Sequence, residues 1–245
     1  LAAFEGIHSY LSLEGRSAVF RLRDHVVRLL DSAHIGGLKI PFSKKEILEA
    51  CKETLRVNKL KEGYIRPIVF IGEGVMGVYP GDNPIRVAIA TWSWGAYLGE
   101  GAIEKGIRVK VSSYTRHHVN VMMTKAKISG NYVNSVLAKR EAMKMGYDEA
   151  LMLDTEGYVS EASGENVFMV KNGLLKTTPL TSILSGITRD SVIQIAKWKK
   201  IPLVEEKFTR DEFYTAHEAF FTGTAAELTP IREVDIWKDS KEALK

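Results

Sequence analysis

The chain has 245 residues, 45% hydrophobic and 26% charged, a composition typical of a globular protein with a sizeable core. Its formal net charge of +4 comes from basic residues interleaved with acidic ones, as in KKEILEACKE, which argues against the clustered basic stripe of a nucleic-acid-binding protein. The single cysteine, Cys51, excludes an internal disulfide framework and is compatible with a buried thiol in a reducing cytoplasm.

No segment indicates a membrane protein. The longest uncharged run, residues 87–99, is too short to span a bilayer, and no signal peptide is visible. Because the chain starts at Leu1 rather than Met, we expect that an N-terminal piece is absent.

The N-terminal part alternates strand and helix signals. Ser43 is a plausible N-cap with Glu46 three residues later, the spacing of a capping box. Turn signals at Pro80-Gly81 and Asn83-Pro84 separate two β-rich runs. The other elements expected here are strands at 18–22, 64–71 and 87–92 and helices at 23–33 and from 43 onward.

Glycines at positions 95, 99, 101 and 106 predict a linker, after which the pattern changes again. Gly146 suits the end of a helix, and Asn172-Gly173 predicts a type I′ hairpin turn. The expected elements are strands at 107–112, 149–154, 158–161, 166–171 and 218–222, helices at 131–145 and 186–199, and a helix or turn in GTAAELTP. We therefore expect an α/β protein (α+β by some schemes) with a small N-terminal domain at 1–99, a linker at 100–106 and a larger domain at 107–245.

Lys127 precedes Ile128-Ser129-Gly130-Asn131 at a predicted junction into a helix. A lysine that forms a Schiff base must be neutral part of the time, which requires a desolvated or cation-rich setting. Taken alone, a lysine in such a place is usually a surface lysine, and only the motifs around Lys127 make it a candidate.

Glu161 and Glu165 flank a glycine in DTEGYVSEASGEN. The pair could be an ordinary polar turn, but a carboxylate beside a pyridine nitrogen stabilises the protonated ring that serves as an electron sink. Phosphate needs backbone N–H groups and a cation, for which Gly186-Ile187-Thr188, Gly223-Thr224-Ala225 and Arg28 are candidates.

These residues lie in motifs that resemble the bacterial branched-chain aminotransferases, which are class IV aminotransferases of pyridoxal-phosphate fold type IV. The motifs occur in one order over nearly the whole chain, from FEGI at Phe4 to Asp235: YIRPIVF, GVMGVYP, WGAYLGE, KISGNYVNS, DTEGYVSEASGENVF, SGITRD and GTAAELTP. The resemblance implies transamination of leucine, isoleucine and valine with 2-oxoglutarate, pyridoxal 5′-phosphate as cofactor, no metal, and a homo-oligomer whose partners are amino acids and 2-oxo acids.

The resemblance also assigns roles. Lys127 matches the Schiff-base lysine that moves the proton, Tyr132 the partner of the phenolic oxygen, and Glu161 the partner of the pyridine nitrogen. The matches to the phosphate cradle and the ring contact are Arg28, Ile187, Thr188, Thr224 and Leu184. The matches to the substrate site are Phe4, Tyr64, Trp94 and Tyr97 as walls, Arg66 for the γ-carboxylate of glutamate, and Thr224 and Ala225 for the α-carboxylate.

Three departures from the family pattern are visible. His8 stands where the family commonly has arginine, which affects the polar edge of the substrate site. The family's segment before FEG is missing, and Ile236 directly follows Asp235, so we expect a lost loop there or a truncated chain. D-amino-acid transaminases, aminodeoxychorismate lyases and R-selective amine transaminases share the lysine and glutamate framework, and a non-catalytic module of the same fold is a further alternative.

Overall fold

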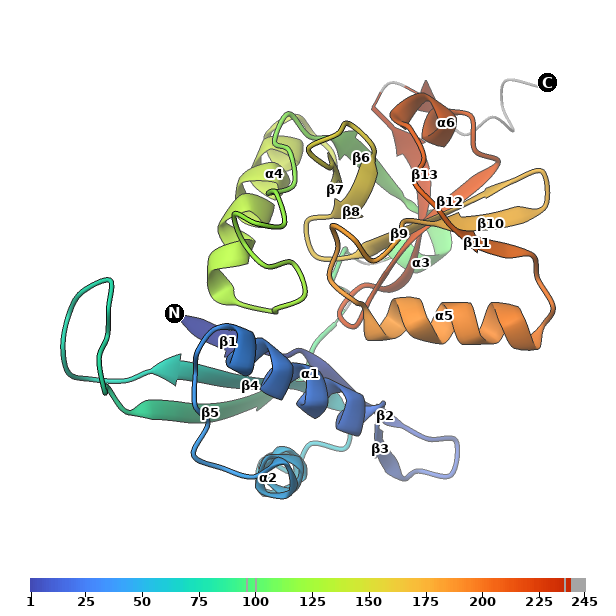
Figure 1. Ribbon diagram of the computed structural model, residues 1–245. Helices are drawn as coiled ribbons and strands as arrows, with labels where there is room; N and C mark the ends of the chain where they lie inside the picture. Colours follow the sequence, from blue (N-terminus) through green and yellow to red (C-terminus); the bar gives the residue numbers. More distant parts are fainter. Residues whose placement is uncertain (96, 100, 236, 239–245) are drawn as a thin grey trace. The chain divides into compact units, whose positions relative to one another are not determined.

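The computed structural model describes residues 1–95, 97–99, 101–235 and 237–238. The junction between Asp235 and Ile236, where we expect a lost loop, includes a residue outside this described part. Two compact units are present: Leu1–Gly95 with Lys125–Asn131, and Ala96–Thr124 with Tyr132–Lys245. Each unit combines strands with helices, so the predicted α/β class is confirmed (Figure 1). The predicted domain boundaries stay a prediction.

The first unit is built on a five-stranded antiparallel sheet in the order β1-β4-β2-β3, with β5 paired to the other edge of β4 along nearly its whole length, from Tyr64 to Ile71. Two helices pack against this sheet (Figure 1). The elements are β1 (Ala2–Phe4), β2 (Ile7–Leu11), β3 (Ser17–Val19), α1 (Leu22–Ile35), α2 (Lys44–Val57), β4 (Gly63–Ile71) and β5 (Ile85–Trp92).

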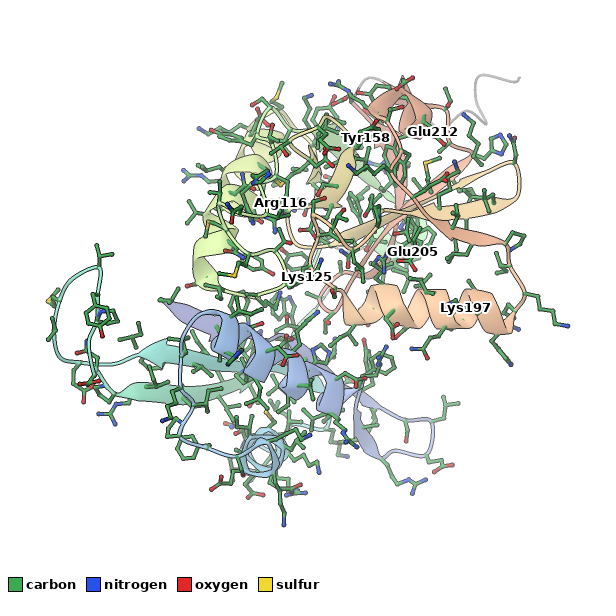
Figure 2. All side chains as sticks on the ribbon, viewed as in Figure 1. Arg116, Lys125, Tyr158, Lys197, Glu205 and Glu212 are labelled. Atoms are coloured by element: carbon green, nitrogen blue, oxygen red, sulfur yellow. The ribbon has the colours of Figure 1, made fainter. Side chains whose placement is uncertain are left out.

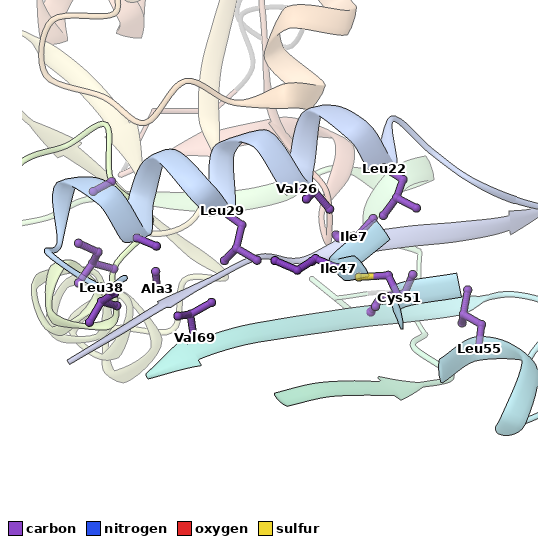
Figure 3. Close-up of a cluster of buried hydrophobic side chains, with 14 residues drawn as sticks. Ala3, Ile7, Leu22, Val26, Leu29, Leu38, Ile47, Cys51, Leu55 and Val69 are labelled. Carbon is purple, nitrogen blue, oxygen red and sulfur yellow. The ribbon is translucent and has the colours of Figure 1, made fainter. Parts of the chain in front are cut away.

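The core of the first unit lies between helices α1 and α2 and the sheet (Figure 3). Apolar residues recur at helical spacing along α1, with Val26 and Leu29 fully buried, while Val69 of β4 closes the core from the sheet side. Ala126 and Ile128 belong to the same core although they come from a later segment of the chain. Burial of this apolar surface is what fixes that segment to the first unit.

The second unit contains a nine-stranded mixed sheet in the order β11-β10-β9-β12-β13-β6-β7-β8, with β14 paired to β13. Its strands curl around a core that Phe221, Val167 and Val109 fill from within the sheet. The elements are α3 (Ala102–Lys105), β6 (Ile107–Val111), η1 (Ser129–Asn131, in the first unit), α4 (Tyr132–Lys144), β7 (Glu149–Leu153), β8 (Val159–Ala162), β9 (Asn166–Lys171), β10 (Leu174–Thr177), α5 (Ile187–Trp198), β11 (Leu203–Glu205), α6 (Arg210–Tyr214), β12 (Glu218–Gly223), β13 (Glu227–Val234) and β14 (Trp237–Lys238).

Several local sequence signals are confirmed. Ser43 and Glu46 make both hydrogen bonds of the capping box at the start of α2. Asn172 and Gly173 have φ angles of 51° and 77°, as a type I′ turn between β9 and β10 requires. Of the helix or turn expected in GTAAELTP, the turn is confirmed: the chain turns at residues 224–226 and continues as β13, which pairs with both β12 and β6.

Within the described part of the chain, no helix combines the length and the apolar character that crossing a membrane requires.

Candidate active site

The residues that the sequence predicts for the site are divided between the two units. The first unit carries Phe4, Arg28, Tyr64, Arg66, Trp94 and Lys127. The second carries Tyr97, Tyr132, Glu161, Leu184, Ile187, Thr188, Thr224 and Ala225.

Lys127 is anchored through its own backbone. Its carbonyl oxygen accepts a hydrogen bond from the N–H of Phe4 at 3.1 Å, and its N–H donates to Oγ of Ser32 on α1 at 2.9 Å. Ser32 is fully buried, and the Lys127 Nζ atom lies 4.9 Å from the centre of the Phe4 ring. The neighbouring Ile128 forms a β-bridge with Ala3, so the backbone around the lysine is held against strand β1. The lysine is therefore presented from a fixed support.

Arg28 takes part in a buried ionic group that the sequence did not reveal. Its Nε and Nη2 atoms lie 2.6 and 2.9 Å from the two carboxylate oxygens of Glu5, and Nδ1 of His25 lies 2.8 Å from Oε2 of the same carboxylate. Burial alone would raise the pKa of Glu5, but the Arg28 charge and the hydrogen bonds from His25 and Arg28 bring that pKa down to about 2. Glu5 is therefore ionised.

Arg66 is surrounded by aromatic rings. Its guanidinium carbon lies 5.0 Å from the centre of the Phe4 ring, 5.4 Å from that of Tyr64 and 5.9 Å from that of Trp92. Its Nη2 atom is also 3.5 Å from the Tyr64 hydroxyl. Such an arrangement leaves the planar cation next to apolar surface, and it places an acid-binding group among walls that suit a hydrocarbon branch.

The same aromatic group extends along the sheet. The centre of the Trp94 ring lies 4.3 Å from that of Tyr64 and 5.3 Å from that of Trp92, so Trp94 belongs to the same aromatic group. His8 pairs with Tyr64 across strands β2 and β4, and its ring stacks on Tyr10 with 4.3 Å between centres. Tyr10 and Trp92 are additions that the motifs did not indicate.

Glu161 lies at the centre of a buried group of polar contacts in the second unit. Its Oε1 atom lies 2.9 Å from Nε of Arg116, and its Oε2 atom accepts hydrogen bonds from Asn166 Nδ2 at 3.2 Å and from the Leu184 N–H at 3.1 Å. Both Glu161 and Arg116 are almost completely buried, and Nη1 of Arg116 (labelled in Figure 2) also lies 3.3 Å from Oγ of Ser135 on α4. These contacts fix the direction of the carboxylate.

Helix α5 begins in a way that suits an anion. Gly186 is its N-cap residue and makes no side-chain cap hydrogen bond. Ile187 and Thr188 are the first two residues of the helix, where backbone N–H groups point out of the helix end. A Cβ atom at Gly186 would come within 1.9 Å of Oδ1 of Asn166, so only glycine fits beside this side chain. Asn166 in turn donates to the Leu184 carbonyl at 3.0 Å, which ties the turn before α5 to the Glu161 carboxylate.

The remaining predicted residues lie elsewhere in the second unit. Thr224 and Ala225 form the turn between β12 and β13, where a Cβ at Gly223 would come 3.2 Å from Cγ of Glu165. Tyr132 opens helix α4. Tyr97 is 40% exposed, and its ring centre lies 5.9 Å from Nζ of Lys139.

Sequence reasoning missed the residues that hold the nominated ones. These are Glu5, His25, Ser32, Arg116 and Asn166. A signal existed for two of them, because His25, Arg28 and Ser32 follow one another at intervals of three and four and therefore share a face of the predicted helix. Arg116 lies in an irregular segment, where no periodicity could reveal its partner.

The chain matches the family model for amino-transferase class IV over residues 2–234. It is 53% identical over 235 residues to the branched-chain-amino-acid aminotransferase of Pseudomonas aeruginosa, a match that covers 96% of this chain and 76% of that protein. The structure is similar to the crystal structure of the Escherichia coli branched-chain amino acid aminotransferase, with a TM-score of 0.95, 46% identity, and coverage of 97% and 79% of the two chains. It is also similar to the branched-chain amino acid aminotransferase of Thermobaculum terrenum in its PLP-bound form, with a TM-score of 0.91, 36% identity, and coverage of 97% and 78%.

Proposed function

The chain belongs to the amino-transferase class IV family, and on that basis we propose how its residues carry out transamination. Its activity is that of a branched-chain-amino-acid aminotransferase (EC 2.6.1.42), which transfers the amino group of leucine, isoleucine or valine to 2-oxoglutarate with pyridoxal 5′-phosphate as cofactor. The observation that supports this function best is the backbone-anchored Lys127, because a binding module has no use for a lysine held in this way.

The residues present fit the cofactor. The first turn of α5 lies at a helix N-terminus, where backbone N–H groups favour an anion such as phosphate, and Asn166 leaves no room for a side chain at Gly186. Glu161 offers an oriented carboxylate to a protonated ring nitrogen. When bound, pyridoxal phosphate supplies the conjugated ring that accepts the electron pair released at the substrate Cα atom.

We assign Lys127 the covalent and proton-transfer roles. Its Nζ atom would hold the cofactor through the aldehyde group and, once the substrate amine has taken its place there, would accept the proton from the substrate Cα. The Lys127 backbone accepts a hydrogen bond from the Phe4 N–H and donates one to Ser32 Oγ, and these two bonds fix the point from which the side chain extends. We assign Arg28, Ile187, Thr188 and Thr224 to the phosphate, Tyr132 to the phenolic oxygen and Leu184 to the ring face.

We assign substrate recognition to the aromatic group around Arg66. Phe4, Tyr64 and Trp94 offer apolar surface to a branched side chain, and Arg66 offers a guanidinium to the γ-carboxylate of glutamate. The two substrates thus share one pocket because cation and aromatic walls lie side by side. We assign Tyr97, Thr224 and Ala225, which belong to the second unit, to substrate binding as well.

We also propose that the enzyme works as a homo-oligomer in the cytoplasm. The turn between β4 and β5 exposes large apolar side chains, including Met76, Val78 and Tyr79, and exposed apolar side chains of this size commonly mark contacts between subunits. The single cysteine, Cys51, is buried, and burial raises the pKa of its thiol to about 12, so it is an unreactive thiol compatible with a reducing compartment.

An absorption spectrum of the purified protein with and without L-leucine tests the function. We expect a visible band from the cofactor held by Lys127, and a shift of that band into the near-ultraviolet when L-leucine is added. A response to D-alanine or to an amine, with none to L-leucine, would instead indicate one of the related transaminases. Absence of any band after pyridoxal phosphate is added would contradict the assignment.

A further inference from the structure

Helix α1 has two buried faces of different chemistry. Leu22, Val26, Leu29 and Ala33 form the apolar face that packs in the core of the first unit (Figure 3). His25, Arg28 and Ser32 form a second, polar face, on which the exposed fractions are 1% for His25 and 0% for Ser32. Burial of polar side chains is unfavourable unless each has a partner, so this face calls for a specific explanation.

The partner of two of these residues is Glu5, in the turn between β1 and β2. Its carboxylate is completely buried and lies close to four donors, namely Nε and Nη2 of Arg28, Nδ1 of His25 and, at 3.3 Å, the N–H of Gly6. The two contacts from Arg28 are bidentate, which fixes the plane of its guanidinium and not only its position. The orientation of Arg28 therefore depends on the orientation of Glu5.

His25 is the group that completes the support of Glu5 from the helix. Burial lowers the pKa of His25, and the charges of Arg28 and Lys127 act in the same direction, against the hydrogen bond and charge of Glu5. A neutral imidazole next to a carboxylate carries its proton on the nitrogen that faces it, so Nδ1 donates to Glu5.

The charge state of His25 matters for Arg28. A second cation at this point would share the charge of Glu5 and repel the guanidinium, whereas a neutral donor supports the carboxylate and leaves its charge to Arg28. The same face of α1 also carries Ser32, which accepts the hydrogen bond from the Lys127 N–H. One helix face thus supports both the arginine and the reactive lysine.

We propose that His25 is a positioning residue. Its imidazole donates a hydrogen bond to Glu5 and so holds the Glu5 carboxylate, which in turn fixes the guanidinium plane of Arg28 for the cofactor phosphate. The inference rests on the proposed phosphate-binding role of Arg28 and extends it by two residues. Its physical basis is preorganisation, since a guanidinium that is already oriented loses less conformational freedom when the phosphate binds.

The test compares two ligands that differ only in the phosphate. The full chain is freed of cofactor and titrated with pyridoxal phosphate and with pyridoxal. The Kd for pyridoxal divided by the Kd for pyridoxal phosphate is then determined for the wild type and for each variant. Arg28→Met is the reference, because it removes the proposed phosphate contact itself. His25→Leu removes the donor to Glu5, and His25→Asn keeps an N–H donor attached to Cγ, as in histidine.

We expect His25→Leu to weaken pyridoxal phosphate binding by about tenfold or more while pyridoxal binding changes by less than about twofold, since a hydrogen bond to a charged group is lost. His25→Asn should retain most of the phosphate preference. Melting temperatures identify any variant that fails to fold. Should His25→Leu fail to fold, Glu5→Gln takes its place and should lower the same ratio.

The outcomes separate the inference from the proposed function. If Arg28→Met lowers the ratio but folded His25→Leu, or Glu5→Gln in its place, leaves it unchanged, Arg28 binds phosphate without this support and the inference is overturned. Equal losses in His25→Asn and His25→Leu would overturn it as well. If Arg28→Met itself leaves the ratio unchanged, the assigned role of Arg28 is wrong, and the inference falls with it.

Discussion

The Nε atom of Arg116 lies 2.9 Å from the Oε1 atom of Glu161, and both side chains are more than nine-tenths buried. A buried pair of this kind holds each charge in place, because removal of one partner leaves the other without compensation. Glu161 also accepts hydrogen bonds from Asn166 and from the Leu184 N–H, which fix the orientation of its carboxylate. This relationship underlies the role that we assign to Glu161.

Replacement of Glu161 by glutamine should lower kcat for L-leucine and 2-oxoglutarate by at least about 100-fold, while the cofactor remains bound. Glutamine has nearly the same shape but lacks the charge that favours the protonated ring nitrogen. Steady-state kinetics together with the cofactor absorbance provide the measurement. Unchanged kinetics in a folded variant would remove the assigned role of Glu161.

Lys127→Ala should abolish transamination and leave the fold intact, since the backbone bonds from Phe4 and Ser32 do not involve the side chain. Lys125→Ala is the matched control from the same segment and should remain active (Figure 2 labels Lys125). Both variants are compared by assay with L-leucine and by circular dichroism. Transaminase activity in Lys127→Ala would refute the assignment of the reactive lysine.

Acidification should destabilise the protein through the buried group around Arg28. The pKa of Glu5 is about 2 in the folded state and 4.5 ordinarily, so its contribution of about 3 kcal/mol is present above pH 4.5 and is lost as the pH falls toward 2. The pKa of His25 is also lowered from 6.5, so its contribution declines as the pH falls below 6.5. Both changes have the same sign.

Thermal unfolding between pH 7.5 and pH 4 measures this effect, and we expect the melting temperature to stay level down to about pH 6.5 and to decrease from there to pH 4. His25→Asn, which cannot titrate there, should flatten the part of the curve just below pH 6.5. A melting temperature that is constant or rises on acidification would show that this group does not govern the acid sensitivity.

Gly186→Ala should weaken cofactor binding by about tenfold or more, because the new Cβ would meet Asn166 Oδ1 at 1.9 Å and force apart the turn that leads into α5. Asn166 cannot swing away without giving up its bonds to Glu161 and to the Leu184 carbonyl. Gly164→Ala is the control, since a Cβ there meets nothing within 4 Å. Equilibrium titration with pyridoxal phosphate gives both values, and equal affinities would contradict the prediction.

Local signals in the sequence predicted local structure well. The capping box at Ser43 and the hairpin at Asn172-Gly173 depend on interactions within a few residues, and the structure confirms both. The tail GTAAELTP was harder, because its conformation is decided by pairing of β13 with β12 and β6 and not by its own propensity. Short strands such as β1 escaped detection for the same reason.

The site could be nominated from its motifs, but its supports could not. Glu5 and His25 are 20 residues apart and meet only when α1 packs on the sheet. Arg116 and Glu161 come from an irregular segment and a strand, with no spacing rule to connect them. Sequence patterns identify the residues that perform chemistry, whereas the neighbours that orient them are defined by tertiary packing.

The placement of Lys125–Asn131 has a consequence for biosynthesis. Ala126 and Ile128 fill the core of the first unit, and Ile128 forms a bridge with Ala3, about 125 residues earlier. During translation the first unit therefore cannot complete its core when residue 95 leaves the ribosome, and it must wait until residue 131 has emerged. A fragment that ends at residue 95 would lack these contacts. The segment that contains the reactive lysine is therefore also the segment that completes the core of the first unit.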